Sequence, residues 1–238
     1  MFEERTYREW VDAKGLVRSS VSIGESDLMI LAPEDVTAPA GLLTREVREL
    51  LEGYVHSDSE FVRAMAPYEP GSDAPAIVQG MAAAGSQFGV GPMASVAGAV
   101  AKYVGEGLAE CDELIIENGG DIFVRSRRPV TMSLYAGDRS PFTGKIRFTV
   151  HPEGGALGVC TSSGTVGHST SFGNADAVTV ISDSAIDADA AATALCNDVK
   201  VQSDVDRVIE KAASCEEIRG IIVAIDDKFG VWGDVELI

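Results

Sequence analysis

The sequence predicts an α+β fold in which helices pack on a largely antiparallel sheet. Short apolar stretches bounded by glycine or aspartate recur along the chain, which is typical of strands joined by tight turns. Other segments repeat apolar residues every three or four positions, which is typical of amphipathic helices. The 238 residues are 45% hydrophobic and 24% charged, and no linker or low-complexity tract interrupts them. We therefore expect one domain over residues 1–238.

Most of the expected strands are short and end at glycine or aspartate. Gly119 and Gly120 separate two of them and indicate a tight hairpin with glycine at positive φ. The two strands predicted between residues 131 and 150 are expected to continue the same sheet as an antiparallel meander. Strands are predicted at residues 5–11, 17–23, 27–31, 114–117, 121–124, 131–135, 145–150, 157–161, 177–181, 220–226 and 230–237.

Helices are predicted between these strands. Pro39 opens a helical stretch in which leucine and valine recur at helical spacing. Asp73 is a plausible N-cap for a second helix, with Pro75 in the first turn, that runs to about residue 84. A glycine-punctuated loop is expected next, at residues 85–91. Further helices are predicted at residues 92–107, 184–197 and 203–213.

The formal net charge of −18 limits the choice of partners. Such a surface repels phosphates, so we expect neither nucleic acid nor an anionic membrane as a partner. A bound phosphate would need a helix N-terminus, a metal ion or a basic patch beside it. No apolar run is long enough to cross a bilayer, and the N-terminus does not resemble a signal peptide. The four cysteines are far apart in sequence, as expected of reduced thiols in a cytoplasmic protein.

The predicted helix at residues 184–197 carries the sharpest chemical signal. Asp189 and Thr193 lie four residues apart, so their side chains share one face about one turn from each other. A carboxylate and a hydroxyl in this arrangement suit a hard cation. The structural alternative is an aspartate that complements the helix dipole and a threonine that bonds back to a carbonyl. Spacing alone leaves both interpretations open and favours the structural one.

Three other segments could form the wall of a ligand site. The glycines that end at Gly91, followed by Met93 and Ala94, could expose N–H groups to a phosphate or simply let two helices pack closely. The predicted hairpin turn and a polar loop offer amides, hydroxyls and one histidine, although turn geometry alone also explains such residues. Cys160, at the end of an apolar strand, fits a buried thiol better than a nucleophile. The candidates in the turn and loop are Asn118, Gly119, Gly120, Asp121, Thr161, Ser162, Ser163 and His168.

Taken in order, these segments resemble the ApbE superfamily, the FAD:protein FMN transferases and their relatives. Residues 188–195 resemble the family's Ala-Asp-Ala-x-Ala-Thr-Ala-Leu helix, and the strand before them also matches. Residues 116–122 resemble the strand that ends in Asn-x-Gly-Gly-Asp, and residues 161–164 resemble the Thr-Ser-Gly loop. The similarity covers residues 85–197, and the shared order of the motifs makes it specific.

The resemblance implies a fold related to the T-fold and a pocket for FAD or FMN. It also implies a Mg²⁺ site formed by Asp189, Thr193 and main-chain oxygen near the helix that follows Gly91. In the transferases, Mg²⁺ neutralises the FAD pyrophosphate while a hydroxyl of a target protein attacks and AMP leaves. T-fold relatives assemble by extending their sheets, so the resemblance implies a homo-oligomer.

Departures from the family pattern affect the implied activity. The family's Asp-x-Gly-Gly-x-x-Lys-Gly segment stands here as residues 91–98 without its aspartate or lysine. The family's His-x-x-Asp-Pro segment stands as residues 168–172 without its proline. The chain resembles a shorter, cytoplasmic branch found in archaea and anaerobic bacteria. Three functions stay open: Mg²⁺-dependent FMN transfer or FAD hydrolysis, flavin-nucleotide binding without catalysis, and an accessory role in sulfide incorporation into homocysteine. The last would need a thiol such as Cys160 or Cys196.

Overall fold

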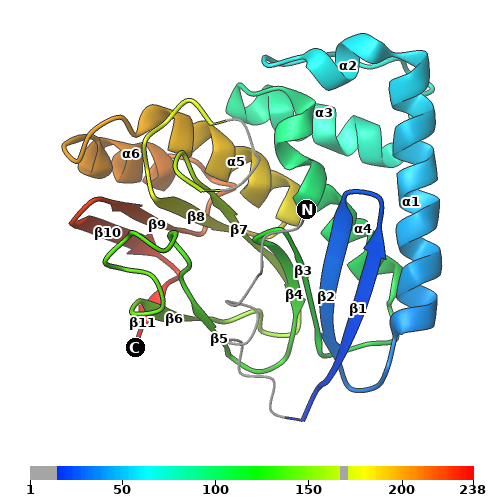
Figure 1. Ribbon diagram of the computed structural model, residues 1–238, viewed down its shortest axis with the longest axis horizontal. Helices are drawn as coiled ribbons and strands as arrows, with labels where there is room; N and C mark the ends of the chain where they lie inside the picture. Colours follow the sequence, from blue (N-terminus) through cyan, green and yellow to red (C-terminus); the bar gives the residue numbers. More distant parts are fainter. Residues whose placement is uncertain (1–14, 167–170) are drawn as a thin grey trace.

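The computed structural model describes residues 15–166 and 171–238 (Figure 1). The strand expected at residues 5–11 and the candidate residue His168 therefore lie outside the described residues. Within them, a large sheet has the strand order β1-β2-β3-β4-β7-β8-β9-β10, and every neighbouring pair is antiparallel. The expected α+β class with a largely antiparallel sheet is confirmed. The strands are β1 (Val17–Ile23), β2 (Ser26–Ala32), β3 (Leu114–Asn118), β4 (Asp121–Arg125), β7 (Ala156–Ser162), β8 (Ala177–Ser182), β9 (Gly220–Ile225) and β10 (Lys228–Gly233).

A second, smaller sheet covers one face of the large sheet. It has the order β11-β6-β5, with β5 at Val130–Ser133, β6 at Arg147–Val150 and β11 at Glu236–Leu237. The expectation that residues 131–150 continue the large sheet is wrong. Met132 and Phe148 instead point their side chains into an apolar core shared with the large sheet. The strand expected at residues 230–237 is divided between β10 and β11, which lie in different sheets.

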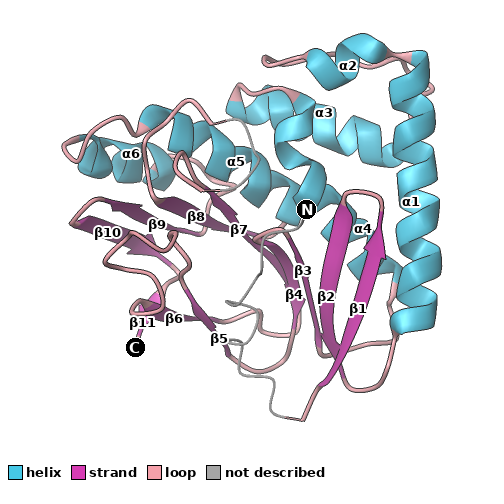
Figure 2. Cartoon of the chain, viewed as in Figure 1, coloured by secondary structure: helices cyan, strands magenta, loops and turns pink. Residues whose placement is uncertain are grey.

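Helices cover the opposite face of the large sheet (Figure 2). The helix expected after Asp73 begins one residue after Pro75, and it continues through residues 85–88, which were expected to be loop. It ends at Gly89, whose φ of 74° is the left-handed conformation that favours glycine at a helix C-terminus. The helices are α1 (Thr37–Ser57), α2 (Ser59–Arg63), α3 (Ala76–Phe88), α4 (Val96–Gly107), α5 (Ala185–Asp198) and α6 (Asp204–Ala213), with a 3₁₀ helix, η2, at Pro92–Ser95.

Four connections of the large sheet lie at the same end of its strands. The pairings Ile23↔Ser26, Asn118↔Asp121, Ser162↔Val178 and Lys228↔Ile225 mark where they join β1 to β2, β3 to β4, β7 to β8 and β9 to β10. Antiparallel pairing of all the neighbours brings these connections to one edge. In the part of the chain that is described, no helix is both long and apolar enough to cross a membrane.

Candidate functional site

A cleft of about 2150 Å³ opens at this end of the large sheet. Ligand pockets are typically about 300–1,000 Å³, so the cleft has room for a dinucleotide. Its walls come from α1, the start of α4, the β3–β4 turn, the end of β7, and the loop between β5 and β6. Eight predicted site residues line it: Met93, Asn118, Gly119, Gly120, Asp121, Thr161, Ser162 and Ser163.

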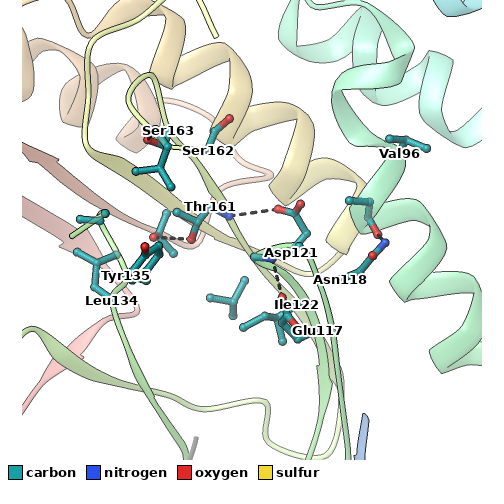
Figure 3. Close-up of a pocket in the computed structure, with 18 of the residues that line it drawn as sticks. Val96, Glu117, Asn118, Asp121, Ile122, Leu134, Tyr135, Thr161, Ser162 and Ser163 are labelled. Carbon is teal, nitrogen blue, oxygen red and sulfur yellow. Dashed lines mark hydrogen bonds between the residues drawn. The ribbon is translucent and has the colours of Figure 1, made fainter. Parts of the chain in front are cut away.

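The β3–β4 turn is tied to the elements on either side of it. Gly119 and Gly120 have φ angles of 72° and 105°, so both adopt a conformation that favours glycine, as the hairpin prediction required. The Asn118 side-chain amide donates to the main-chain oxygen of Ala97 at the start of α4, at 3.1 Å. The main-chain N–H of Thr161 donates to the Asp121 carboxylate at 3.3 Å (Figure 3). Glycine backbone is therefore held in a fixed position at the cleft wall.

Asp189 links α5 to the N-terminus of α4. Its carboxylate accepts a hydrogen bond from the main-chain N–H of Gly98 at 2.9 Å. Helix α4 has no side-chain cap of its own, because the Ser95 hydroxyl donates instead to the carbonyl of Pro92. Asp189 thus complements the positive end of a neighbouring helix and not, as the structural alternative supposed, the end of its own helix.

The two helices cross closely because Gly98 has no side chain. A Cβ at this position would lie 2.9 Å from the Cβ of Asp189 and would overlap the carbonyl oxygen of Ala185. The small residues expected to serve helix packing do so here. The same close crossing places the Asp189 carboxylate within hydrogen-bond distance of α4.

Thr193 lies one turn further along α5, among other oxygen atoms. Its hydroxyl is 3.4 Å from the main-chain oxygen of Ala94 and 3.3 Å from the Ser162 hydroxyl. Helix α5, η2 and the end of β7 therefore meet at this side chain. Carboxylate, hydroxyl and carbonyl oxygens are the ligands that Mg²⁺ prefers, and Mg²⁺ needs only one or two carboxylates because water and phosphate complete its shell.

Two buried carboxylates lie on the helix-covered side of this region. Burial raises the pKa of Asp189 to about 7, although its hydrogen bonds from the α4 backbone act in the opposite direction. Burial raises the pKa of Asp121 well above its ordinary value, and the nearby charge of Asp189 raises it further. Ionising both groups is therefore unfavourable unless a cation lies nearby.

The remaining predicted residues lie away from the cleft surface. Ala94, Asp189 and Thr193 form the layer behind it, which Ser162 connects to the cleft. Gly91 also does not line the cleft, and a Cβ there would overlap the carbonyl oxygen of Ala64, so close packing accounts for this glycine. Among residues 15–166 and 171–238, no group of three or more His, Cys, Asp or Glu side chains could hold a metal ion.

Two features of the cleft were not foreseen from the sequence. Glu117 lines it although the side chain is only 2% exposed, and Arg48 on α1 lines it while donating to Ser26 at 3.0 Å. An acidic residue at the end of an apolar strand was the available signal for Glu117.

The thiols that a sulfur-transfer role would need are both buried, and burial raises the pKa of Cys160 and of Cys196. Both are therefore protonated, and weakly nucleophilic, at neutral pH.

Comparison with known proteins gives the chain its family. The model of the family described as AbpE bacteria matches residues 8–218. The chain belongs to this family. This family is a branch of the ApbE-like superfamily, as the order of the sequence motifs implied.

Relatives of this AbpE-family chain occur in archaea. A UPF0280 protein of Methanocaldococcus jannaschii is 45% identical over 78% of this chain and 77% of its own length. A UPF0280 protein of Methanococcus aeolicus is 37% identical over 92% of this chain and 91% of its own.

Solved structures share the fold. The flavin transferase ApbE from Vibrio cholerae matches with a TM-score of 0.57 and 15% identity, over 92% of this chain and 97% of that one. The apo form of the Pseudomonas stutzeri flavinyl transferase ApbE matches with a TM-score of 0.57 and 16% identity, over 92% and 94%. At identities of 15% and 16%, this likeness shows that the AbpE-family chain shares the fold of these proteins and shows nothing about its activity.

Proposed function

We propose that this protein binds a flavin nucleotide, FAD or FMN, in the cleft together with Mg²⁺. The observation that carries the proposal is the meeting of the Thr193 hydroxyl, the Ala94 carbonyl and the Ser162 hydroxyl behind the cleft wall. Asp189 lies one helical turn from Thr193 on α5 and contacts the start of α4. These oxygens occur in a fold shared with proteins named flavin transferases. Fold alone does not carry function, so the proposal depends on this arrangement of atoms.

The charge of the cleft supports a role for the cation. Among the described residues, eight carboxylates and two arginines line the cleft. A pyrophosphate entering alone would meet a strongly negative surface, whereas a bound divalent cation would reverse the local field. Asp189, Thr193 and the Ala94 carbonyl are the residues proposed to hold Mg²⁺, with water and phosphate oxygens completing its shell.

The proposed chemistry is attack at the FAD pyrophosphate with release of AMP. Bound Mg²⁺ would neutralise charge on the phosphate oxygens. The described residues around the site hold the nucleotide: the backbone at Gly119 and Gly120 admits it closely, and hydroxyls of Thr161, Ser162 and Ser163 can donate to phosphate. His168 is proposed as the catalytic residue on the grounds of its sequence position. The acceptor is proposed to be a hydroxyl of a partner protein or water.

Titration of the purified protein with FAD and Mg²⁺ tests the proposal. Quenching of flavin fluorescence that saturates at one flavin per chain, requires Mg²⁺ and is lost with EDTA is the expected result. Chromatographic detection of AMP then distinguishes turnover from binding alone. Thr193→Val removes one proposed metal ligand and should abolish or strongly weaken the Mg²⁺-dependent binding of flavin. Failure to bind FAD or FMN with Mg²⁺ present, or equal binding by Thr193→Val, would overturn the proposal.

A further inference from the structure

The two arginines that line the cleft differ in how their charge is used. The Arg48 guanidinium pairs with Glu25 and Glu52 and donates to the Ser26 hydroxyl, and only 14% of its side chain is exposed. Arg139, on the loop between β5 and β6, is exposed, and its guanidinium forms no ion pair or hydrogen bond with any other described residue. The described part of the cleft therefore has a single arginine whose charge is not compensated, in a wall that carries eight carboxylates.

The acidic residue beside Arg139 in the sequence does not neutralise it. The Asp138 carboxylate accepts a hydrogen bond from the Tyr135 hydroxyl at 3.2 Å instead. The five N–H donors of the Arg139 guanidinium therefore have no acceptor among the described residues and are open to a ligand. A planar guanidinium matches two oxygens of a phosphate or carboxylate, so the group that it would select is an anion.

The loop that carries Arg139 is folded on itself. The main-chain N–H of Ser140 donates to the Gly137 carbonyl at 3.2 Å, which closes a turn with Arg139 at its third position. The Thr143 hydroxyl donates to the same carbonyl and accepts from the main-chain N–H of Ala136. Because these bonds hold the backbone of Arg139 in place, binding a ligand restricts only the side chain, which lowers the entropy cost of binding.

The same loop is packed against its neighbours on both sides. The Phe142 ring contacts the Phe229 ring of β10, with centroids 5.7 Å apart. A Cβ at Gly137 would lie 2.4 Å from a methyl carbon of Val166, so the turn lies directly against the segment that follows β7. The main-chain N–H of Val166 donates in turn to the Ser163 hydroxyl at 2.9 Å. The turn with Arg139 and the serine-bearing end of β7 are therefore neighbouring walls of the cleft.

We propose that Arg139 binds a phosphoryl group of the flavin nucleotide and thereby selects phosphorylated flavins over riboflavin. The inference rests on the proposed function. The hydroxyls of Ser162 and Ser163 lie on the neighbouring wall, and phosphate oxygens accept from hydroxyl groups as well as from a guanidinium. The proposed Mg²⁺ site lies behind the cleft wall among the helices, whereas the β5–β6 loop belongs to the small sheet. Arg139 and Mg²⁺ thus act on the phosphate from different sides of the cleft.

The test compares FMN with riboflavin, which has the same ring and side chain but no phosphate. Both are titrated by fluorescence quenching with Mg²⁺ present, and wild-type protein should bind FMN about tenfold or more tightly than riboflavin. Arg139→Gln should weaken FMN binding about tenfold or more and change riboflavin binding by less than about twofold. Arg147→Gln is the matched control, because Arg147 is exposed on β6, does not line the cleft and removes the same charge. It should keep the wild-type affinity for both flavins.

The outcomes separate this inference from the proposed function. If wild-type protein binds FMN and riboflavin equally, the inference is overturned without any variant, while flavin binding itself stands. The same holds if Arg139→Gln weakens both flavins equally, keeps the wild-type affinity for FMN, or loses no more FMN affinity than Arg147→Gln. If wild-type protein binds none of riboflavin, FMN and FAD with Mg²⁺ present, the proposed function fails and the inference fails with it.

Discussion

Replacing Asp189 with asparagine should stabilise the metal-free protein at pH 8 while removing its response to Mg²⁺. The side chain is 7% exposed, and burial raises its pKa to about 7 from an ordinary value of 3.8. Asparagine has nearly the same shape, and its oxygen can still accept from the main-chain N–H of Gly98. The substitution therefore removes a buried negative charge and keeps the link between α5 and α4.

The magnitude follows from the difference between the folded and unfolded pKa values. One pKa unit corresponds to about 1.4 kcal/mol, so the ionised Asp189 destabilises the metal-free fold by roughly 4 kcal/mol above pH 7. Because the folded pKa is the higher one, the folded state binds more protons between about pH 4 and pH 7. The contribution of Asp189 to stability therefore falls as the pH rises through this window and is constant on either side of it. The NH₂ group of the asparagine must still find an acceptor, so we expect a net gain of about 1–3 kcal/mol at pH 8.

Urea unfolding followed by circular dichroism, in EDTA at pH 5 and pH 8, measures this effect. Asp189→Asn should be more stable than wild type at pH 8 and should differ less at pH 5. Added Mg²⁺ should stabilise only the wild type, since ligands that bind the folded state raise its stability. Asp206→Asn, whose carboxylate is 77% exposed, is the control and should change stability by less than about 0.5 kcal/mol. A variant that is less stable than wild type at pH 8 would show that the charged cap of α4 outweighs burial, and the reasoning would be refuted.

Three further predictions follow from the same region. Gly98→Ala should lower the free energy of unfolding by about 1–3 kcal/mol, because its Cβ would overlap Ala185; an unchanged urea midpoint would contradict the close crossing. Native Cys160 should resist iodoacetamide and react only after unfolding, since it is buried and its raised pKa keeps the thiol protonated; rapid labelling, seen by mass spectrometry, would contradict this. A homo-oligomer that extends the large sheet through an edge strand, β1 or β10, predicts a light-scattering mass of at least twice the monomer mass, and a monomer would exclude it.

Local signals in the sequence were enough to predict most strands and the β3–β4 hairpin. Gly119 and Gly120 have the positive φ angles that the turn requires, and the apolar runs on either side pair as expected. Such features depend on neighbouring residues alone. The predicted N-terminus of α3 was wrong because it relied on the capping preference of a single residue. Asp73 is a good capping residue, but Pro75 occupies the N-cap position in the structure.

The small sheet could not be predicted in this way. Met132 and Phe148 show the same alternation in either sheet, and only contacts between distant segments decide which sheet they join. Strand β11, which pairs Glu236 with Thr149, supplies one such contact. Because Met132, Leu134 and Phe148 line the cleft, misplacing these strands also hides the part of the cleft wall that they form.

The helix-covered side of the large sheet carries buried charge close to the cleft. Asp121 and Asp189 are both buried there, and burial raises the pKa of each carboxyl. In the proposed complex, a cation-screened pyrophosphate beside the β3–β4 turn would compensate these two carboxylates. A Cβ at Gly120 would have only the Thr161 carbonyl within 4 Å, at 3.9 Å, so the backbone is open there. Buried charges that lower the stability of a fold are retained most readily where a ligand compensates them, as the proposed Mg²⁺ would for Asp121 and Asp189.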